Sequence, residues 1–323
     1  MPFPNALKHR TTLNQTMLSK ADIHVHTKYS GLAHYKFLKF PESASNPEDV
    51  VKIAKKVGLS VLCITDHNSI AGALKAKEYA KDDPDIEVVI GEEVSTKDGE
   101  VIGLFLTEEI PMDLSAEETI LRIRKQGGVV LAPHPYSGHV SAIGNLIETL
   151  DIDGIEVING GHIDGIANNK ALERSKCGRW ACVAGSDAHA LGQLGCCCTM
   201  FEGRTAEDLR ASILNKTTQP FGSSTTLDRG IRWSIGVVIY ADKLVLMSFL
   251  GMLKGEDPED PIIKIIKKMP FSKKMGILFG SLFYLTPPVP YLVGITSEKI
   301  LKKWNHTIDA KNAEATRKHI VTK

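Results

Sequence analysis

Seven side chains of the types that bind metal ions lie at the ends of short apolar runs in the first two-thirds of the chain. They are His24, His26, His67, Glu93, His134, Asp187 and His189. His24 and His26 are two residues apart, as are Asp187 and His189, so each pair points to one side of an extended strand and can share an ion. Seven ligands are too many for one ion, which takes about four to six, so the set favours two or three ions bridged by a carboxylate.

Mixed imidazole and carboxylate ligands suit Mn²⁺, Zn²⁺ or Fe²⁺ better than Mg²⁺, which prefers oxygen. A single histidine is more often a surface or core residue than a ligand, and each spaced pair also occurs by chance. The evidence is the coincidence, because the chain has 11 histidines and five of them fall at predicted strand ends. The sequence therefore predicts a centre of two or three divalent ions.

The segments between these residues alternate between strands and helices. Apolar runs predict strands at residues 21–26, 60–65, 86–90, 101–106, 128–131, 152–158 and 180–184. Helices are predicted at 46–58, 69–81, 115–127 and 205–215, with another ending near 177. Asn46 before Pro47 favours a helix start, and Ser115 with Glu118 has the form of a capping box. The alternation favours a barrel-like or doubly wound α/β fold, and β/α barrels carry catalytic groups at the carboxyl ends of their strands.

Composition limits the class of protein and its location. The chain has 323 residues, 43% of them hydrophobic and 24% charged, which suits one large α/β domain with an appendage. The net charge is +1, but residues 232–323 hold 15 Lys and Arg against 8 Asp and Glu, so this tail carries +7 and the first 231 residues carry −6. Three of the six cysteines are consecutive at 196–198, which suits small buried strand residues better than a disulfide framework.

The first twenty residues lack the apolar core of a secretory signal, and together with the cysteine layout this predicts a cytoplasmic protein. We expect an N-terminal tail at 1–20, a catalytic domain at 21–225 and a helical extension at 226–323.

The extension contains an apolar segment at 276–295, twenty residues without charge that lysines flank on both sides. As a helix it is long enough to cross about 30 Å of hydrocarbon, and lysines suit anionic headgroups. Three prolines inside it interrupt such a helix. The segment predicts either attachment to a membrane surface, at the inner face of the membrane, or a buried helical pair over the barrel. The run at 235–253, with a charge pair inside it, predicts an amphipathic helix.

Five motifs occur in order along the chain. They are His24-Val-His26-Thr-Lys-Tyr-Ser30, Ile64-Thr-Asp-His-Asn68, Gly91-Glu-Glu-Val-Ser-Thr96, Ala132-Pro-His-Pro135 and Gly185-Ser-Asp-Ala-His189. In these segments, over residues 21–221, the chain resembles the polymerase and histidinol phosphatase (PHP) family. The resemblance implies a distorted (β/α)7 TIM-like barrel with two or three metal ions. It also implies hydrolysis of phosphate esters, since members act on histidinol phosphate, nucleotide bisphosphates or nucleic-acid ends.

The resemblance further implies that the seven residues named first are the metal ligands, and that His67, Asp187 and His189 take part in catalysis. Two positions depart from the family pattern. Gly31 stands where many members have Asp, and Glu100 stands where many have His. Glu100 is therefore a candidate eighth ligand.

In the implied reaction a metal-activated hydroxide attacks phosphorus, and the ions offset the charge of the transition state. His189 and Asp66 are candidates for the general acid. Lys28 in the first loop is a candidate substrate-binding residue, as are Glu156 and Asn159, which stand at a strand end.

The expected substrate is a phosphorylated small molecule or nucleotide. An exonuclease or phosphodiesterase on short RNA or DNA ends is the nearest alternative, although the acidic body shows no basic stripe with interleaved aromatics. A non-enzymatic metal-binding regulatory module is another, although degenerate domains usually lose their ligands first. A metal-dependent amidohydrolase requires a ligand lysine at a strand end, and none is evident. The sequence gives no indication of the oligomeric state.

Overall fold

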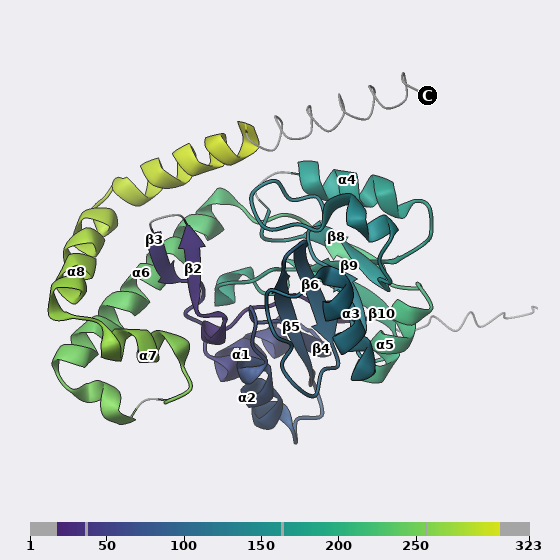
Figure 1. Cartoon of the computed structure of the whole chain (residues 1–323), viewed down its shortest axis with the longest axis horizontal. Coiled ribbons are helices and arrows are strands. Elements are labelled where there is room, and N and C mark those ends of the chain that lie inside the picture. The colour runs from purple at the N-terminus through teal and green to yellow at the C-terminus, as the bar shows by residue number, and fades with distance from the viewer. Residues whose placement is uncertain (1–17, 36–37, 163–164, 256, 304–323) are drawn as a thin grey trace, which may run out of the picture.

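Figure 1 shows a strand-rich barrel on the right and a group of C-terminal helices on the left. The computed structural model describes residues 18–35, 38–162, 165–255 and 257–303. Within these residues, nine strands form one sheet and two more form a separate hairpin. The large sheet is the scaffold that holds the strand-end residues in place.

The large sheet is a nearly closed mixed α/β barrel. Its order is β11-β10-β1-β4-β5-β6-β7-β8-β9. The strands are β1 (Leu18–Asp22), β4 (Val61–Ile64), β5 (Glu87–Thr96), β6 (Gly99–Leu104), β7 (Val129–Ala132), β8 (Gly154–Asn159), β9 (Ala181–Gly185), β10 (Cys197–Glu202) and β11 (Gln219–Gly222). β6 and β10 are antiparallel to their neighbours, and the other seven described strands run in one direction. This architecture confirms the predicted fold class, although the described sheet holds two antiparallel strands beside the seven that run together.

The two ends of the sheet meet through side-chain hydrogen bonds. Thr199 of β10 accepts a hydrogen bond from the backbone N–H of Ala184 in β9 and donates one to its carbonyl, each at 2.9 Å. Thr218, just before β11, donates to the carbonyl of Cys182 at 2.8 Å. These hydroxyls satisfy backbone groups at the edge of β9 that a neighbouring strand would otherwise pair with.

Five helices pack around the barrel, and they confirm the helices predicted from the sequence. They are α1 (Pro47–Lys56), α2 (Ala71–Ala80), α3 (Ala116–Lys125), α4 (Ile166–Ser175) and α5 (Ala206–Leu214). Ser115 caps α3 by accepting a hydrogen bond from the backbone N–H of Glu118 at 3.2 Å. In β4, Leu62 and Ile64 pack against the outer helices, whereas Val61 and Cys63 face the barrel interior.

Helix α5 covers the amino-terminal end of the barrel. Its Leu209 and Ile213 pack with interior residues such as Phe201, and the backbone N–H of Ala206 donates to Glu87 at the start of β5, at 2.8 Å. The loops that carry the predicted ligands are at the opposite, carboxyl end of the strands.

Besides β10, which the sequence indicated only through the strand-like packing of its cysteines, three strands were not predicted: the hairpin β2 (Leu32–Tyr35) and β3 (Leu38–Pro41), and β11. Each has only four residues, too short for apolar periodicity to identify. β1 was predicted to reach residue 26 but ends at Asp22, because the chain then leaves the ladder and only Val25 bridges, to Ala188. Cys197 and Cys198 are buried in β10, as their predicted strand packing requires.

The C-terminal helices are α6 (Leu227–Phe249), α7 (Pro261–Lys268), α8 (Phe271–Leu285) and a further helix, Val289–Lys303. Among the described helices, none alone is long and apolar enough to cross a bilayer. α8 and the helix Val289–Lys303 together meet the length and composition for a span, but they are bent by 84° at the prolines between them.

The start of α7 is fastened to the loop of the first motif. Asp260 is fully buried, and its Oδ2 atom lies 3.1 Å from Nζ of Lys28. Its Oδ1 atom accepts hydrogen bonds from the backbone N–H groups of Ile262 and Ile263, at 2.9 and 3.2 Å. Next to it, the hydroxyl of Tyr29 donates to Asp257. A residue far away in the sequence thus fixes the loop that follows His26.

We expect Asp260→Asn to lower the free energy of unfolding by about 3 kcal/mol, because it leaves the buried Lys28 ammonium without its counter-charge. Asparagine can still cap α7, so the loss reports the ion pair rather than the cap. Urea unfolding of the full chain measures it. Glu259→Gln, at a neighbouring carboxylate whose side chain is 66% exposed, is the matched control and should change stability by less than about 0.5 kcal/mol. Equal values for the two variants contradict the role of the ion pair.

Candidate metal centre

The carboxylate of Glu93 is the point at which the predicted ligands meet. Glu93 lies in β5 and is 1% exposed. Its Oε2 atom lies 3.2 Å from Nε2 of His24 and 3.3 Å from Nε2 of His26. The same oxygen is 3.3 Å from Nδ1 of His67, and Oε1 is 2.9 Å from Nε2 of His134. Four imidazoles from three segments surround one carboxylate, as expected of a ligand that bridges ions.

Asp187 supplies a second carboxylate to the same place. Its Oδ1 atom lies 3.3 Å from Nε2 of His26, 3.6 Å from Nε2 of His24 and 3.4 Å from Nδ1 of His189. The residue follows β9 with a left-handed φ of 50°, and its backbone N–H donates to the carbonyl of His24 at 2.8 Å. The backbone strain at this position is compensated by contacts that aim the side chain at the histidines.

The hydrogen bonds of His24 and His26 show that this donor set fits a cation. Nδ1 of His24 donates to Glu156 at 3.2 Å. Nδ1 of His26 donates to the hydroxyl of Ser30 at 3.0 Å, and that hydroxyl gives its own proton to Asp66 at 2.8 Å. In the neutral rings, both Nε2 atoms then present lone pairs, and they lie 3.1 Å apart. Two lone pairs and two carboxylate oxygens at one point require a positive charge between them.

The side chains of Glu156 and Asn159 in β8 contact the metal-ligand candidates and do not face a space that a substrate could enter. Besides His24, Glu156 accepts the backbone N–H of His134 and the amide of Asn159, each at 2.8 Å. The Asn159 amide also donates to Oδ2 of Asp187 at 3.1 Å. Both residues are at most 1% exposed. The structure therefore gives these two predicted substrate contacts a positioning role behind the metal ligands.

Glu100 of β6 lies at the edge of the Glu93 cluster. Its Oε2 atom is 3.8 Å from Nε2 of His134 and its Oε1 atom is 3.9 Å from Nδ1 of His67. Glu93 and Glu100 are brought together because β5 and β6 pair in antiparallel register, with Glu93 opposite Ile102. Glu92, the residue before Glu93, points to the opposite side of β5, as strand alternation requires. Its carboxylate accepts a hydrogen bond from the backbone N–H of Ile110 at 2.8 Å.

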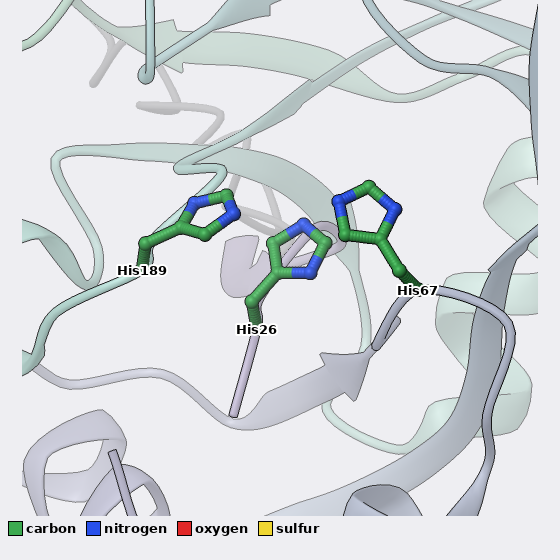
Figure 2. Close-up of side chains that lie close together, drawn as sticks. All are labelled: His26, His67 and His189. Atoms are coloured by element: carbon green, nitrogen blue, oxygen red, sulfur yellow. The ribbon is translucent and has the colours of Figure 1, made fainter. Parts of the chain in front are cut away.

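Glu42 is a site residue that the sequence reasoning missed. Its Oε1 atom lies 3.4 Å from Nε2 of His67 and 3.5 Å from Nε2 of His189. Figure 2 shows His67, His26 and His189 side by side, each from a different segment, and the His26 ring stacks on that of His189 with centroids 4.2 Å apart. The backbone N–H of Glu42 donates to the carbonyl of Gly31 at 3.0 Å, so the β2–β3 hairpin is an insertion that returns the chain to the same place.

That return explains the departure at Gly31. The acidic residue that many family members carry after Ser30 is absent from the linear motif, and Glu42 stands beside that position in space. One indication of Glu42 was present in the sequence, namely the absence of an acidic residue at position 31. Nothing in residues 32–41 indicates that they form a hairpin that brings Glu42 back to that position.

Electrostatics at the centre reflect the crowding of carboxylates around imidazoles. Burial alone would lower the pKa of His24 and His67, but the nearby carboxylates outweigh it and hold both well above the usual value. Burial would raise the pKa of Glu93, yet His24 and His67 keep it well below its usual value. Burial and the charge of Glu93 raise the pKa of Glu100 to about 7. In the protein without ions, protons on the rings supply the positive charge that the carboxylates require.

Lys28 and Asp66 have other surroundings than the sequence suggested, and His162 lies beside the predicted ligands. Lys28 is paired with the buried Asp260. Asp66 is fully buried and accepts hydrogen bonds from Thr27 and Ser30, so it shapes the first loop. His162, given no role from the sequence, is 2% exposed with its ring centroid 6.2 Å from that of His134, and its Nδ1 atom has no hydrogen-bond partner.

Four overlapping groups of these side chains have ligand atoms within 4.8 Å of one another, counted over the described residues. A cluster of imidazoles and carboxylates at the carboxyl end of a β/α barrel defines a class, the barrel metalloproteins whose strand ends hold the ions. Within that class, the chain belongs to the PHP domain family. The model of the PHP domain matches residues 22–150, and a model described as PHP-associated matches residues 165–218. The resemblance read from the five motifs is thereby confirmed.

Similar proteins support the family without naming a substrate. An uncharacterized protein of Methanocaldococcus jannaschii is 53% identical over 155 residues, which are 48% of this chain and 90% of that protein. A second uncharacterized protein of the same organism is 32% identical over 186 residues, 54% of this chain and 68% of that one.

Among solved structures, a two-domain protein from Bacteroides vulgatus, described as containing a predicted PHP-like metal-dependent phosphoesterase, is similar with a TM-score of 0.52 and 19% identity. The match covers 64% of this chain and 65% of that one. At this identity the likeness supports the fold alone.

We expect Glu156→Gln to weaken metal binding about 10- to 100-fold, since it removes a partner that orients the ligands. In either orientation of the new glutamine side chain, its NH2 group faces another donor, which is either the Nδ1–H of His24 or the backbone N–H of His134. Calorimetric titration of metal-free protein with Mn²⁺ measures the change.

Glu92→Gln is the matched control for this variant. Burial raises the pKa of Glu92 to about 8, so the side chain is mostly neutral at pH 7 and an amide replaces it without loss of charge. Its affinity for Mn²⁺ should match that of the unsubstituted chain. An unchanged affinity in Glu156→Gln would show that Glu156 does not position His24.

Proposed function

We propose that the chain is a metal-dependent phosphoesterase that hydrolyses a phosphate ester of a small molecule or a nucleotide. The observation that carries the proposal is the pair of Nε2 atoms of His24 and His26, 3.1 Å apart and both within 3.6 Å of oxygens of Glu93 and Asp187. Divalent ions held by such ligands activate water and offset the negative charge that develops around phosphorus.

Two positions for ions follow from the ligand atoms. His24, His26 and Asp187 form one group, and His24, Glu93 and His134 form another. Because Nδ1 of His24 donates to Glu156, the single lone pair on its Nε2 atom can serve only one of the two ions. Oε2 of Glu93 lies near His24 and His26, and its Oε1 lies near His134. Glu93 is therefore the carboxylate that we propose as the bridge. Nitrogen and oxygen donors in this mixture favour Mn²⁺, Zn²⁺ or Fe²⁺.

Glu42, His67 and His189 support a third position. Nδ1 of His189 donates to the carbonyl of Asp187 at 2.9 Å, so in the neutral ring its Nε2 lone pair faces the carboxylate of Glu42. Facing a carboxylate with a lone pair is unfavourable unless a cation or proton lies between them. His189 then acts as a ligand rather than as the general acid considered from the sequence.

The residues proposed for catalysis are the ligands that reach the surface. The side chains of His67 and Asp187 are each 18% exposed and that of His189 is 17% exposed, whereas those of His24 and His26 are fully buried. A substrate entering from solvent meets these three first, so we assign His67, Asp187 and His189 to the reacting phosphate. Because Lys28 is engaged by Asp260, the ions supply most of the positive charge that the phosphate meets.

The charge of the body favours a small substrate. Residues 1–231 carry a net charge of −6, which repels a long polyanion. We also propose a cytoplasmic location, because all six cysteines are free thiols, as a reducing compartment maintains them.

A substrate screen tests the proposal. The full chain, loaded in turn with Mn²⁺, Zn²⁺ and Fe²⁺, is incubated with phosphorylated metabolites, nucleotides and short oligonucleotides. We expect release of phosphate or cleavage of a phosphodiester from one of the small molecules. If only the oligonucleotides are cleaved and their binding depends on salt, the substrate is a nucleic-acid end and not a small molecule. No hydrolysis with any metal, in protein shown to hold its ions, overturns the proposed activity.

We expect Asp187→Asn to reduce hydrolysis roughly 100-fold or more, because it removes a charged oxygen ligand beside His26. Steady-state rates with the substrate from the screen measure the loss, and circular dichroism checks the fold. Glu92→Gln should retain full activity. Activity of Asp187→Asn within a factor of about two of the unsubstituted chain would contradict its place in the site.

Glu42→Gln tests the third position independently of turnover. We expect the metal content, measured by mass spectrometry after dialysis against Mn²⁺, to fall from about three ions per chain to about two. Glu259→Gln, a surface carboxylate away from the histidines, is the control and should leave the count unchanged. The same content in Glu42→Gln as in the unsubstituted chain limits the site to the two positions at Glu93.

A further inference from the structure

The side of α8 that packs against α6 carries two buried polar residues beside the apolar Ile277 and Leu278. Ser281 is 7% exposed, and its hydroxyl donates to Asp242 of α6 at 2.7 Å. Lys274, seven residues earlier on the same line of the helix, is 8% exposed and donates to Ser248 of α6 at 2.6 Å. In a water-soluble helix pair such polar groups normally face solvent and the apolar groups face the partner.

The outer side of α8 is apolar instead. Phe271, Phe279, Leu282 and Phe283 are 68%, 67%, 69% and 73% exposed. At 100° per residue these four side chains fall within an arc of about 120°, away from Lys274 and Ser281. A helix with polar contacts inside and large apolar side chains outside is arranged for an apolar environment.

The helix Val289–Lys303 continues this exposed apolar surface. Its Tyr291, Leu292 and Ile300 are 53%, 58% and 56% exposed. The opposite side rests on the start of α6, where a Cβ added to Gly294 would lie 2.7 Å from Ile231. The backbone contact holds the helix in place, so its apolar side chains do not turn inward.

Exposed lysines precede and follow this apolar stretch along the chain, and none of residues 275–297 is charged. Lys267, Lys268 and Lys273 are exposed at the amino-terminal end of α8, where the helix dipole adds further positive potential. The tail from residue 232 has a net charge of +7. The surface therefore combines an apolar centre with a basic rim.

We propose that α8 and the helix Val289–Lys303 bind an anionic lipid bilayer and lie in its interface. The basic rim complements anionic headgroups, and the aromatic and aliphatic side chains enter the acyl boundary. A second copy of this chain would bring the same positive rim against it and is disfavoured. The 84° bend makes a surface-lying anchor a better fit than a straight span. This anchor lies on the C-terminal helices and does not depend on the proposed hydrolysis.

The anchor is attached to the metal centre through α6. Nε1 of Trp233 in α6 donates to the backbone carbonyl of Glu42 at 2.8 Å, and the Trp233 ring centroid lies 6.1 Å from that of His189. The anchor is therefore joined to the barrel by α6, a helix that also contacts the metal centre. Together with the proposed function, this arrangement places hydrolysis at the membrane surface.

Vesicle flotation of the full chain, without detergent, tests the anchor. Vesicles of phosphatidylcholine alone are compared with vesicles that contain about 30% phosphatidylglycerol. We expect binding to the anionic vesicles to exceed that to the neutral ones by roughly 10-fold, and Phe279→Ser with Leu282→Ser and Phe283→Ser to reduce it by roughly 10-fold. Lys267→Gln with Lys268→Gln and Lys273→Gln should remove the preference for anionic vesicles.

The matched control is Leu74→Ser with Leu121→Ser and Leu172→Ser, three leucines on the barrel helices that are 47%, 54% and 44% exposed. It also replaces three exposed apolar side chains by serine, although these leucines expose less apolar surface than the three residues of α8, and it should bind vesicles as the unsubstituted chain does. Circular dichroism and metal content confirm that each variant is folded. The proposal is overturned if the unsubstituted chain does not float with either vesicle. It is also overturned if both triple-serine variants lose binding equally, or if sedimentation shows a dimer that the α8 substitutions dissociate.

Discussion

The structure depends on one electrostatic constraint: lone pairs and carboxylate charge converge on a buried point beside Glu93, and only positive charge can stabilise that arrangement. The Nε2 atoms of His24 and His26 lie 3.1 Å apart there. In water such groups would separate, but the barrel prevents this because their segment, β4 and β5 are joined by backbone hydrogen bonds, such as that from the N–H of Thr65 to the carbonyl of Val25 at 2.9 Å. The fold thus prepares the binding of a cation, since the donor atoms are held together before the ion arrives and the ion replaces the protons that balance the carboxylates in its absence.

A shell of buried polar residues holds this arrangement in place. Asp66, Glu156 and Asn159 accept or donate at nearly every polar atom they have, and each connects the ends of two or more strands. A buried polar network is stabilising only when it is almost completely satisfied, because each unpaired group keeps its full desolvation cost. The same residues therefore set the orientation of the imidazoles and the register of the strand ends, which explains why carboxylates in this region serve as supports as well as ligands.

The sequence predicted the part of the site that depends on short spacing. Strand periodicity and pair spacing located His24, His26 and Asp187, because strand ends meet at one edge of a barrel whatever the intervening loops do. The choice of Glu93 over the adjacent Glu92 rested on its position in the family motif. Glu42 was not predictable in this way: the chain reaches it through the β2–β3 hairpin, and closure of that insertion rests on one backbone contact with Gly31. Lys28 lies in the predicted loop, whereas Glu156 lies inside β8 and not at its end, and their partners, Asp260 and His24, lie 232 and 132 residues away. A local sequence pattern predicts where a residue lies along a strand or loop. The direction in which its side chain points depends on partners that are far away in the sequence.

The C-terminal helices show the same limit for an apolar segment. From composition alone, residues 276–295 suit a lipid phase and a protein core equally, because both require uncharged side chains. What separates the two is the direction in which the few polar groups point. Ser281 and Lys274 turn toward Asp242 and Ser248, beside Ile277 and Leu278. Phe279, Leu282 and Phe283 stay exposed, whereas a helix in a protein core would bury such side chains. Since Nε1 of Trp233 in α6 donates to the carbonyl of Glu42, the packing of α6 against the barrel and the placement of this carboxylate beside His67 and His189 are consequences of one arrangement.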